Sequence, residues 1–428
     1  MNTPKLVIID GVRTPFCKMG TDLARLGADE LGRIATQALL TRTAIDPAII
    51  DEVIFGCVGQ PADAANVARV IALRAGIPES VPAITVHRNC ASGMEAFTQA
   101  YEKMCAGRGE VFVVGGTESM SNYPLLYTPQ AAAKFGKLSR AKTLGQKLGA
   151  FAAFRPKDLF APRIGLMLGL TDPTCGLNMG ETAEILAREY ELSREKQDAF
   201  AVESHARAIA ARDKLAEEIC PVYPPATKQV INADNGPRKD STLEALAKLR
   251  PVFDKKNGTV TAANSSQITD GAVALLVMTE ERAKKLGLTP IGALTGYAYA
   301  GCDPQRMGLG PVFAIAKAEE QLGLTLEQAD VVEINEAFAA QVLACLRAMK
   351  SDEFAQKHLK RARCLGKIEK DRLNVNGGGI SLGHPVGATG ARLILTSLRE
   401  LARRQSKRAL VSLCVGGGQG AAIWLERI

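Results

Sequence analysis

The sequence predicts an α/β protein made of two similar halves, with a helix-rich segment inserted between them. Strand-like and helix-like segments alternate along most of the 428 residues, a pattern typical of α/β folds. The order of these segments repeats, and the hexapeptide DEVIFG at 51–56 aligns with DVVEIN at 330–335. The repeating unit is too long for a solenoid, so we expect two copies of one α/β unit.

Each half shows its own strands and helices in the hydrophobic pattern. In the first half, short apolar runs predict strands at 6–9, 53–55, 83–86 and 111–114. Apolar residues at helical spacing predict helices at 31–40 and 91–105. In the second half, the same criteria predict helices at 312–322 and 391–398 and strands at 331–334 and 410–413.

The segment between the halves has a different character. It is rich in proline and in helix-forming residues, and we expect it to be an inserted domain at 120–250. The first half then covers 1–119 and 251–290, and the second covers 291–428. No acidic residue occurs between Glu118 and Asp158, although lysines and arginines are frequent there. This basic stretch is either a helix docked on its own protein or, over 131–170, a surface for anionic lipid or a partner subunit.

Composition excludes several classes of protein. No apolar run approaches the roughly 18–20 residues that span a bilayer. The ten cysteines form no CxxC pair or zinc-like cluster, which predicts no metal site and a reducing, cytoplasmic location. The net charge of +8 comes with only 5% aromatic residues, so we expect no nucleic-acid binding and instead a polyanionic small-molecule ligand.

Two glycine-rich segments contain a candidate nucleophile and a candidate base. Cys90 lies between a predicted strand and a predicted helix, and a thiol at a helix N-terminus has its thiolate favoured by the helix dipole. His384 is one of four histidines, and glycines surround it just before another helix. A histidine in such a loop is suited to taking the proton of a thiol. A buried, inert cysteine and a structural histidine are the alternatives.

Two further segments follow strands of the second half. Cys414 ends a strand and precedes three glycines, whose backbone N–H groups could face an oxyanion. Asn335 stands between a strand and a helix, where it is either an N-cap or an amide that holds a catalytic water. A tight turn with an unreactive cysteine is the alternative for Cys414.

Together these segments resemble the thiolases, the acetyl-CoA C-acyltransferases, over the whole chain. The matching strings are GVRTPF, NCASGMEA, GGTESMS, NMGETAE, KLRPVFD, GTVTAANSS, NEAFAAQ, NVNGGGISLGHPVGATGAR and CVGGGQG. The resemblance implies cleavage of 3-ketoacyl-CoA by CoA, or the reverse condensation, through an acyl-cysteine intermediate. The resemblance implies that the reaction requires no metal or redox cofactor, and that CoA takes part as a substrate.

The resemblance also implies a role for each matching residue. Cys90 would be the acylated nucleophile, His384 its activating base and Cys414 the acid/base at the α-carbon. Asn335 would hold a water at the enolate oxygen, and the backbone N–H groups of Cys90 and Gly416 would form the second oxyanion hole. Contacts to CoA and substrate would fall on four residues, Met179, Arg238, Ser266 and Phe338.

Family fold and assembly follow from the same resemblance. We expect a thiolase-like α/β fold with two duplicated αβαβα halves, an inserted helix-rich loop domain, and a homodimer or homotetramer. The long insertion is similar to that of fatty-acid oxidation complex β-subunits, which implies a hydratase/dehydrogenase partner subunit and peripheral membrane contact. Another condensing enzyme of the superfamily and a non-catalytic lipid carrier or scaffold on this fold are the alternatives.

Overall fold

One continuous sheet organises the computed structural model, which describes residues 4–225 and 229–428. The strands run in the order β10-β11-β12-β9-β1-β8-β5-β3-β4, and short β2 pairs with β8. Their bounds are β1 Leu6–Arg13, β2 Cys17–Lys18, β3 Glu52–Gly56, β4 Ala83–Val86, β5 Val111–Ser119, β8 Thr269–Thr279, β9 Gly292–Gly301, β10 Val331–Ile334, β11 Arg408–Val415 and β12 Gln419–Glu426.

The sheet contains the same motif twice, which confirms the predicted duplication. In the first half, β1 and β8 are antiparallel, β8 and β5 are antiparallel, and β5 and β3 are parallel. In the second half, β9, β12, β11 and β10 repeat this order and these directions. Within the described part of the sheet, the halves join where two residues of β1 pair with two of β9. The inserted segment therefore interrupts the first copy, between β5 and β8.

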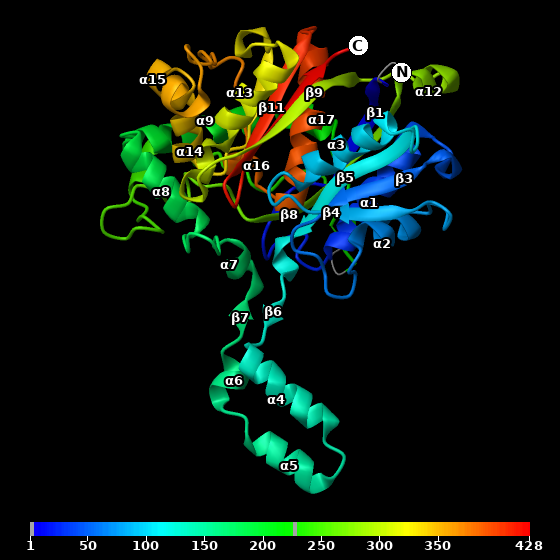
Figure 1. Ribbon diagram of the computed structural model, residues 1–428, viewed down its shortest axis with the longest axis vertical. Coiled ribbons are helices and arrows are strands. Elements are labelled where there is room, and N and C mark those ends of the chain that lie inside the picture. Colours follow the sequence, from blue (N-terminus) through cyan, green and yellow to red (C-terminus); the bar gives the residue numbers. More distant parts are fainter. Residues whose placement is uncertain (1–3, 226–228) are drawn as a thin grey trace.

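Helices and the two halves of the sheet stack in five layers, with helices on both outer faces and in the middle (Figure 1). The bounds of those that build the body are α1 Ala28–Thr43, α2 Val67–Arg74, α3 Ser92–Cys105, α12 Glu280–Leu286, α13 Gly310–Leu322, α14 Ala339–Ala348, α15 Asp352–Phe354, α16 Gly379–Leu382 and α17 Val386–Arg404. Helices α1 and α2 pack on the outer face of the first half, and α13 and α14 on that of the second. Helices α3 and α17 share one core with both halves. The five αβαβα layers therefore belong to the two halves together, which share their middle layer, rather than to each half.

The two middle helices meet through glycines. Gly93 of α3 and Gly390 of α17 face the partner helix at the crossing. A Cβ built on Gly390 would lie 2.6 Å from the backbone N of Met94, and one on Gly93 would lie 2.8 Å from that of Ala391. No other residue type allows two backbones to approach this closely. The approach brings the N-terminal ends of α3 and α17 together.

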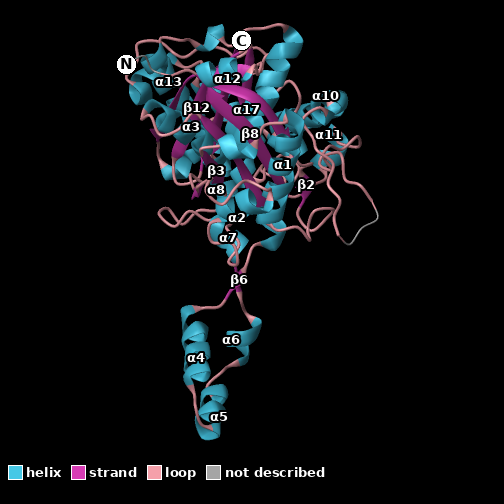
Figure 2. Cartoon of the chain, turned by 90° about the vertical axis from the view of Figure 1, so that its right-hand side faces the viewer, coloured by secondary structure: helices cyan, strands magenta, loops and turns pink. Residues whose placement is uncertain are grey.

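The insertion contributes helices to the body and also forms a projecting arm. Its helices are α4 Pro129–Arg140, α5 Leu144–Ala152, α6 Pro156–Phe160, α7 Gly165–Gly169, α8 Met179–Glu189, α9 Arg194–Ala210, α10 Arg212–Ala216 and α11 Leu243–Ala247. Helices α4, α5 and α6 extend away from the body on a stalk made of β6 (Leu125–Leu126) and β7 (Arg163–Ile164), as Figure 2 shows.

The arm is exposed rather than docked on the body. No residue of α5 is buried, and the side chains of Leu144, Leu148 and Phe151 are 74%, 62% and 64% exposed. Of the two interpretations of the basic stretch, a helix docked on its own protein is wrong. In the described parts of the chain, none of the helices has the length and apolar character that crossing a membrane requires.

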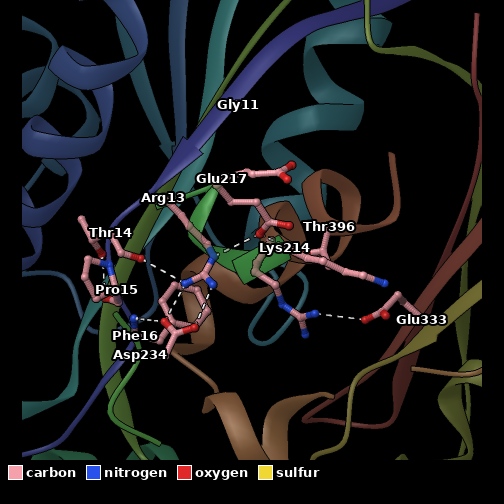
Figure 3. A network of polar contacts seen from close by, with 12 residues as sticks. Gly11, Arg13, Thr14, Pro15, Phe16, Lys214, Glu217, Asp234, Glu333 and Thr396 are labelled. Carbon is pink, nitrogen blue, oxygen red and sulfur yellow. Dashed lines mark hydrogen bonds and ion pairs between the residues drawn. The ribbon is translucent and has the colours of Figure 1, made fainter. Parts of the chain in front are cut away.

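A buried polar network ties the insertion to the body (Figure 3). Arg13, at the end of β1, donates to both carboxylate oxygens of Asp234 at 2.7 and 2.8 Å, and to Glu218 at 3.1 Å. Glu218 also accepts the hydroxyl of Thr396 from α17 at 3.0 Å. All four side chains are almost fully buried. Such bonds are directional, so they fix the insertion relative to the middle layer.

Candidate active site

Cys90 lies in the turn between β4 and α3. The hydroxyl of Ser92 accepts the N–H of Arg88 at 2.9 Å and donates to the carbonyl of Asn89 at 2.7 Å, which closes the turn on both sides of the cysteine. Cys90 is partly buried and lines a cavity of about 400 Å³. The strand–cysteine–helix arrangement that the sequence predicts is therefore present.

His384 lies just before α17 and faces the same cavity. Its Nδ1 is 2.6 Å from the hydroxyl oxygen of Thr389, and that hydroxyl donates to the carbonyl of Pro385 at 3.0 Å. Because the Thr389 proton is used there, the hydroxyl oxygen accepts from Nδ1–H, and Nε2 carries the lone pair. Nε2 is buried and has no hydrogen-bond partner among the described residues. The ring is thus fixed in the tautomer that can take a proton from the cavity side.

Cys414, near the end of β11, completes the group of reactive side chains. It is 1% exposed, and its thiol lines the cavity with Cys90 and His384. The turn that follows it places Gly416 and Gly417 in the cavity wall. Cys90 and Cys414, which are 324 positions apart in the sequence, thus line one cavity together with His384.

Asn335 is not a helix cap. It follows β10, and α14 begins only at Ala339. Both of its amide atoms are fully buried and have no hydrogen-bond partner within the described chain. The glycine-rich segment 377–379 packs against this amide, since a Cβ on Gly379 would lie 3.0 Å from the Oδ1 of Asn335. Native proteins rarely leave a buried amide unpaired, so this one is available to a bound group.

The predicted ligand contacts fall on two separate cavities. Met179, Ser266 and Phe338 line the main cavity with the reactive residues. Arg238 lines a second cavity of about 250 Å³ together with His205. Its contact with CoA stays a prediction. Burial lowers the pKa of His205 to about 4, and the positive charge of Arg238 adds to this effect.

Burial dominates the electrostatics of the reactive groups. Burial raises the pKa of the Cys90 thiol, and the nearby N–H groups of Gly416 and Cys90 lower it by less. Burial also raises the pKa of Cys414 well above its usual range, and Cys90 raises it further. Burial lowers the pKa of His384 to about 4, with Arg392 adding to the effect. The N–H groups near Cys90 therefore act on its thiol in the predicted direction, and burial opposes them with the larger effect.

Two residues that support the base were missed in the sequence. Thr389 orients the ring of His384, as described above. Glu118 is fully buried at the end of β5, and its carboxylate accepts the N–H of Gly387 at 2.8 Å and that of Gly59 at 2.7 Å. It thereby anchors the loop that carries His384. A charged residue within a fully buried strand is the signal for Glu118, whereas an isolated threonine in a helix gives none.

The cavity also has an apolar wall that comes from the insertion. Helix α7 and the residue that follows it contribute Leu166, Leu168 and Leu170 to the lining. Met307 and Phe338 extend this wall from the second half. In the described part of the chain, no group of three or more His, Cys, Asp or Glu residues could hold a metal ion.

Comparison with known proteins places the chain in a family. Models of the thiolase N-terminal domain and thiolase C-terminal domain match residues 6–281 and 288–427. The chain is 42% identical to a 3-ketoacyl-CoA thiolase of Pectobacterium carotovorum, over 99% of this chain and 96% of that protein. It is 41% identical to one of Pseudoalteromonas translucida, over 100% and 98%.

Solved structures agree with the sequence relatives. The acetyl-CoA acetyltransferase of Bacillus anthracis superposes with a TM-score of 0.86 at 37% identity, covering 100% of this chain and 99% of that one. Human mitochondrial 3-ketoacyl-CoA thiolase in complex with CoA gives 0.86 at 36% identity, covering 100% and 98%. The chain therefore belongs to the thiolase family and has its fold, and it is an acyltransferase.

Proposed function

We propose that the chain is a 3-ketoacyl-CoA thiolase that works through an acyl-Cys90 intermediate. The proposal rests on one observation above all, the convergence of Cys90, Cys414 and the unpartnered Nε2 of His384 on one cavity. Two thiols and a neutral imidazole supply a nucleophile, an acid/base and a proton acceptor. The names of the relatives described above support the same substrate class.

The first half-reaction breaks the carbon–carbon bond. His384 takes the proton of Cys90, and the thiolate attacks the C3 carbonyl of 3-ketoacyl-CoA. The bond between C2 and C3 breaks, its electron pair forms the enolate of acetyl-CoA, and Cys414 donates a proton to C2. Asn335 would stabilise the enolate oxygen through a water, and the N–H groups of Cys90 and Gly416 would stabilise the oxyanion at C3.

The second half-reaction releases the shortened chain. The thiolate of Cys414 takes the proton of the CoA thiol, and the sulfur of CoA attacks the carbonyl of acyl-Cys90. The Cys90 thiolate leaves and recovers its proton from His384. The products are acetyl-CoA and an acyl-CoA shorter by two carbons. Neither half-reaction involves net oxidation or reduction, and each proton has a donor and an acceptor among the side chains and substrates. The proposed steps therefore use no metal or redox cofactor.

Thiolysis tests the proposal directly. Purified protein should cleave acetoacetyl-CoA and a long-chain 3-ketoacyl-CoA when CoA is added, and Cys90→Ala should abolish both activities. Without CoA, mass spectrometry of the wild type should show one acyl group on Cys90, and Cys90→Ala should carry none. Folded wild-type protein that cleaves neither substrate, or that acylates elsewhere, overturns the proposal.

We further propose that the cavity accepts acyl chains longer than acetyl and that the insertion at 120–250 carries the CoA contacts. The two catalytic halves then comprise 1–119 with 251–290, and 291–428. The apolar wall at 166–170 supports the first statement, since each buried methylene contributes about 0.8 kcal/mol. We expect kcat/KM to rise with chain length, and a preference for acetoacetyl-CoA would contradict this.

We propose that the arm docks on anionic membrane through 131–170. Its exposed apolar side chains, such as Phe160 at 82%, lie among basic residues, as membrane-surface helices require. Sedimentation with phosphatidylserine vesicles at low salt should be lost in Leu144→Asp/Leu148→Asp and kept in the control Leu243→Asp, which places the same change on exposed α11. Wild type that stays in the supernatant refutes membrane docking and leaves a hydratase/dehydrogenase subunit as the occupant.

We also propose a homodimer, or a homotetramer made of two such dimers, in the cytoplasm. Strand β4 pairs with β3 alone and ends the sheet, and Ile84 on it is 39% exposed, which suits pairing with a second copy. All ten cysteines are free, as in reducing compartments. Sedimentation equilibrium should give at least twice the chain mass, whereas the mass of one chain would refute this.

A further inference from the structure

Asn89, the residue before the proposed nucleophile, has an unusual backbone conformation. Its φ is +43°, in the left-handed region that side chains other than glycine seldom adopt. Asparagine is among the residues that tolerate this region best, because its short amide can hydrogen-bond locally. The conformation turns the chain sharply just ahead of Cys90. Asn89 itself is part of the lining of the cavity.

The Asn89 amide makes a contact between the two halves of the molecule. Its Nδ2 donates to the carbonyl oxygen of Gly416 at 2.8 Å, although the two residues are 327 positions apart in the sequence. The acceptor is a carbonyl, so the amide nitrogen must face it. Both residues line the cavity that holds Cys90.

Gly416 lies at the start of the turn between β11 and β12. It begins a run of three glycines, and Gly417 and Gly418 have φ values of +89° and +78°. A Cβ on Gly417 would meet nothing within 4 Å, and one on Gly416 only Met179 and the Asn89 amide. The far end of this turn is held by the carbonyl of Gly418, which accepts the N–H of Cys302 at 2.7 Å, whereas at Gly416 the amide of Asn89 provides the contact. Yet the N–H of Gly416 lies close enough to Cys90 to lower the pKa of its thiol.

We propose that Asn89 is a positioning residue that holds the Gly416 N–H against the acyl group on Cys90. The hydrogen bond to the Gly416 carbonyl fixes that residue, so its N–H stays aimed at the oxygen that becomes negative when the thioester is attacked. Preorganised donors stabilise such an oxygen more than mobile ones do. This inference rests on the proposed function, because it assigns Asn89 to the same acyl transfer.

Substitutions at Asn89 separate its backbone role from its amide role. Asn89→Gly keeps a residue that adopts φ +43° freely but removes the amide. Asn89→Asp keeps the shape and the tolerance of this φ but turns a carboxylate oxygen toward the Gly416 carbonyl. Urea unfolding of both variants establishes that they are folded, so a loss of activity is not a loss of structure.

The measurement is steady-state thiolysis together with the pH dependence of Cys90 alkylation by iodoacetamide. In Asn89→Gly we expect kcat to fall about 10-fold with KM nearly unchanged, since the donor is misplaced rather than removed. Asn89→Asp should lose more. The alkylation midpoint should move to higher pH in both variants, because the Gly416 N–H no longer stays at the thiol.

The outcomes distinguish this inference from the proposed function. If wild type is active, Cys90→Ala is inactive, and Asn89→Gly matches wild type in kcat and in alkylation midpoint, Asn89 serves only the backbone conformation and the inference is overturned alone. If wild type itself cleaves no 3-ketoacyl-CoA, the proposed function fails and the inference fails with it. A lower kcat with a raised midpoint supports both.

Discussion

Adding a single methyl group at the crossing of α3 and α17 should increase the distance between Cys90 and His384. Cys90 and His384 stand at the N-terminal ends of these helices, and their spacing depends on how closely the helices approach. Gly390→Ala adds a Cβ that would lie 2.6 Å from the backbone N of Met94 and 2.9 Å from Cγ of the same residue. A backbone atom cannot turn away as a flexible side chain can, so the helices must move apart.

The geometry sets the size of the effect. Ordinary contact begins at 3.4 Å, which leaves a shortfall of 0.8 Å at the Met94 nitrogen. A displacement of about 1 Å between reacting groups costs about 100-fold in rate, so we expect kcat to fall about 10- to 100-fold. Overpacking costs about 1–3 kcal/mol of stability, and the better helix propensity of alanine offsets about 1 kcal/mol of that.

Thiolysis of acetoacetyl-CoA and urea unfolding measure the two effects. Gly149→Ala is the matched control, because it makes the same change in the exposed helix α5, where a Cβ meets nothing within 4 Å. It should leave kcat unchanged and not destabilise the protein. Gly390→Ala with wild-type kcat and wild-type or greater stability would refute the reasoning that close backbone contact sets the distance between Cys90 and His384.

Three further predictions follow from named contacts. Thr389→Val removes the partner of Nδ1 in His384 and should lower kcat about 10-fold with KM unchanged, whereas a change confined to KM would contradict its role. Because the pKa of His384 is lowered to about 4, the ring stays neutral and kcat/KM should show no protonation of this base between pH 7 and 5.5; a midpoint near 6.5 would contradict the burial argument. Arg13→Met leaves Asp234 buried without its cation and should lower the free energy of unfolding by about 3–5 kcal/mol in urea. The control Arg33→Met, which removes the partly exposed ion pair with Glu30 on α1, should cost less than about 1 kcal/mol.

The sequence was sufficient for the fold and for the residues that converge. Alternating patterns give the α/β class, and the repeated hexapeptides fall on β3 and β10, which occupy equivalent places in the two halves. Reactive residues between glycines are recognisable because few other needs place such side chains there. Cys90, His384 and Cys414 are therefore predictable without coordinates.

What the sequence could not supply depends on three-dimensional surroundings. The position of Cys90 before a helix is visible in the sequence, but the burial that raises the pKa of its thiol comes from segments far away in the chain. Arg238 stands in a separate cavity because of the path of the insertion, which no local pattern records. The arm is basic and amphipathic in either interpretation, and only the stalk of β6 and β7 makes it project.

The repeated architecture has a consequence for how this chemistry could arise. Cys90 and His384 each stand two residues before the first residue of a middle-layer helix, α3 at 92 and α17 at 386. An ancestral homodimer of single halves would have carried the same side chain at both places, either two thiols or two imidazoles. Joining the copies in one gene allowed each position to diverge. A cysteine and a histidine can therefore occupy equivalent positions in the two halves, which identical subunits cannot provide.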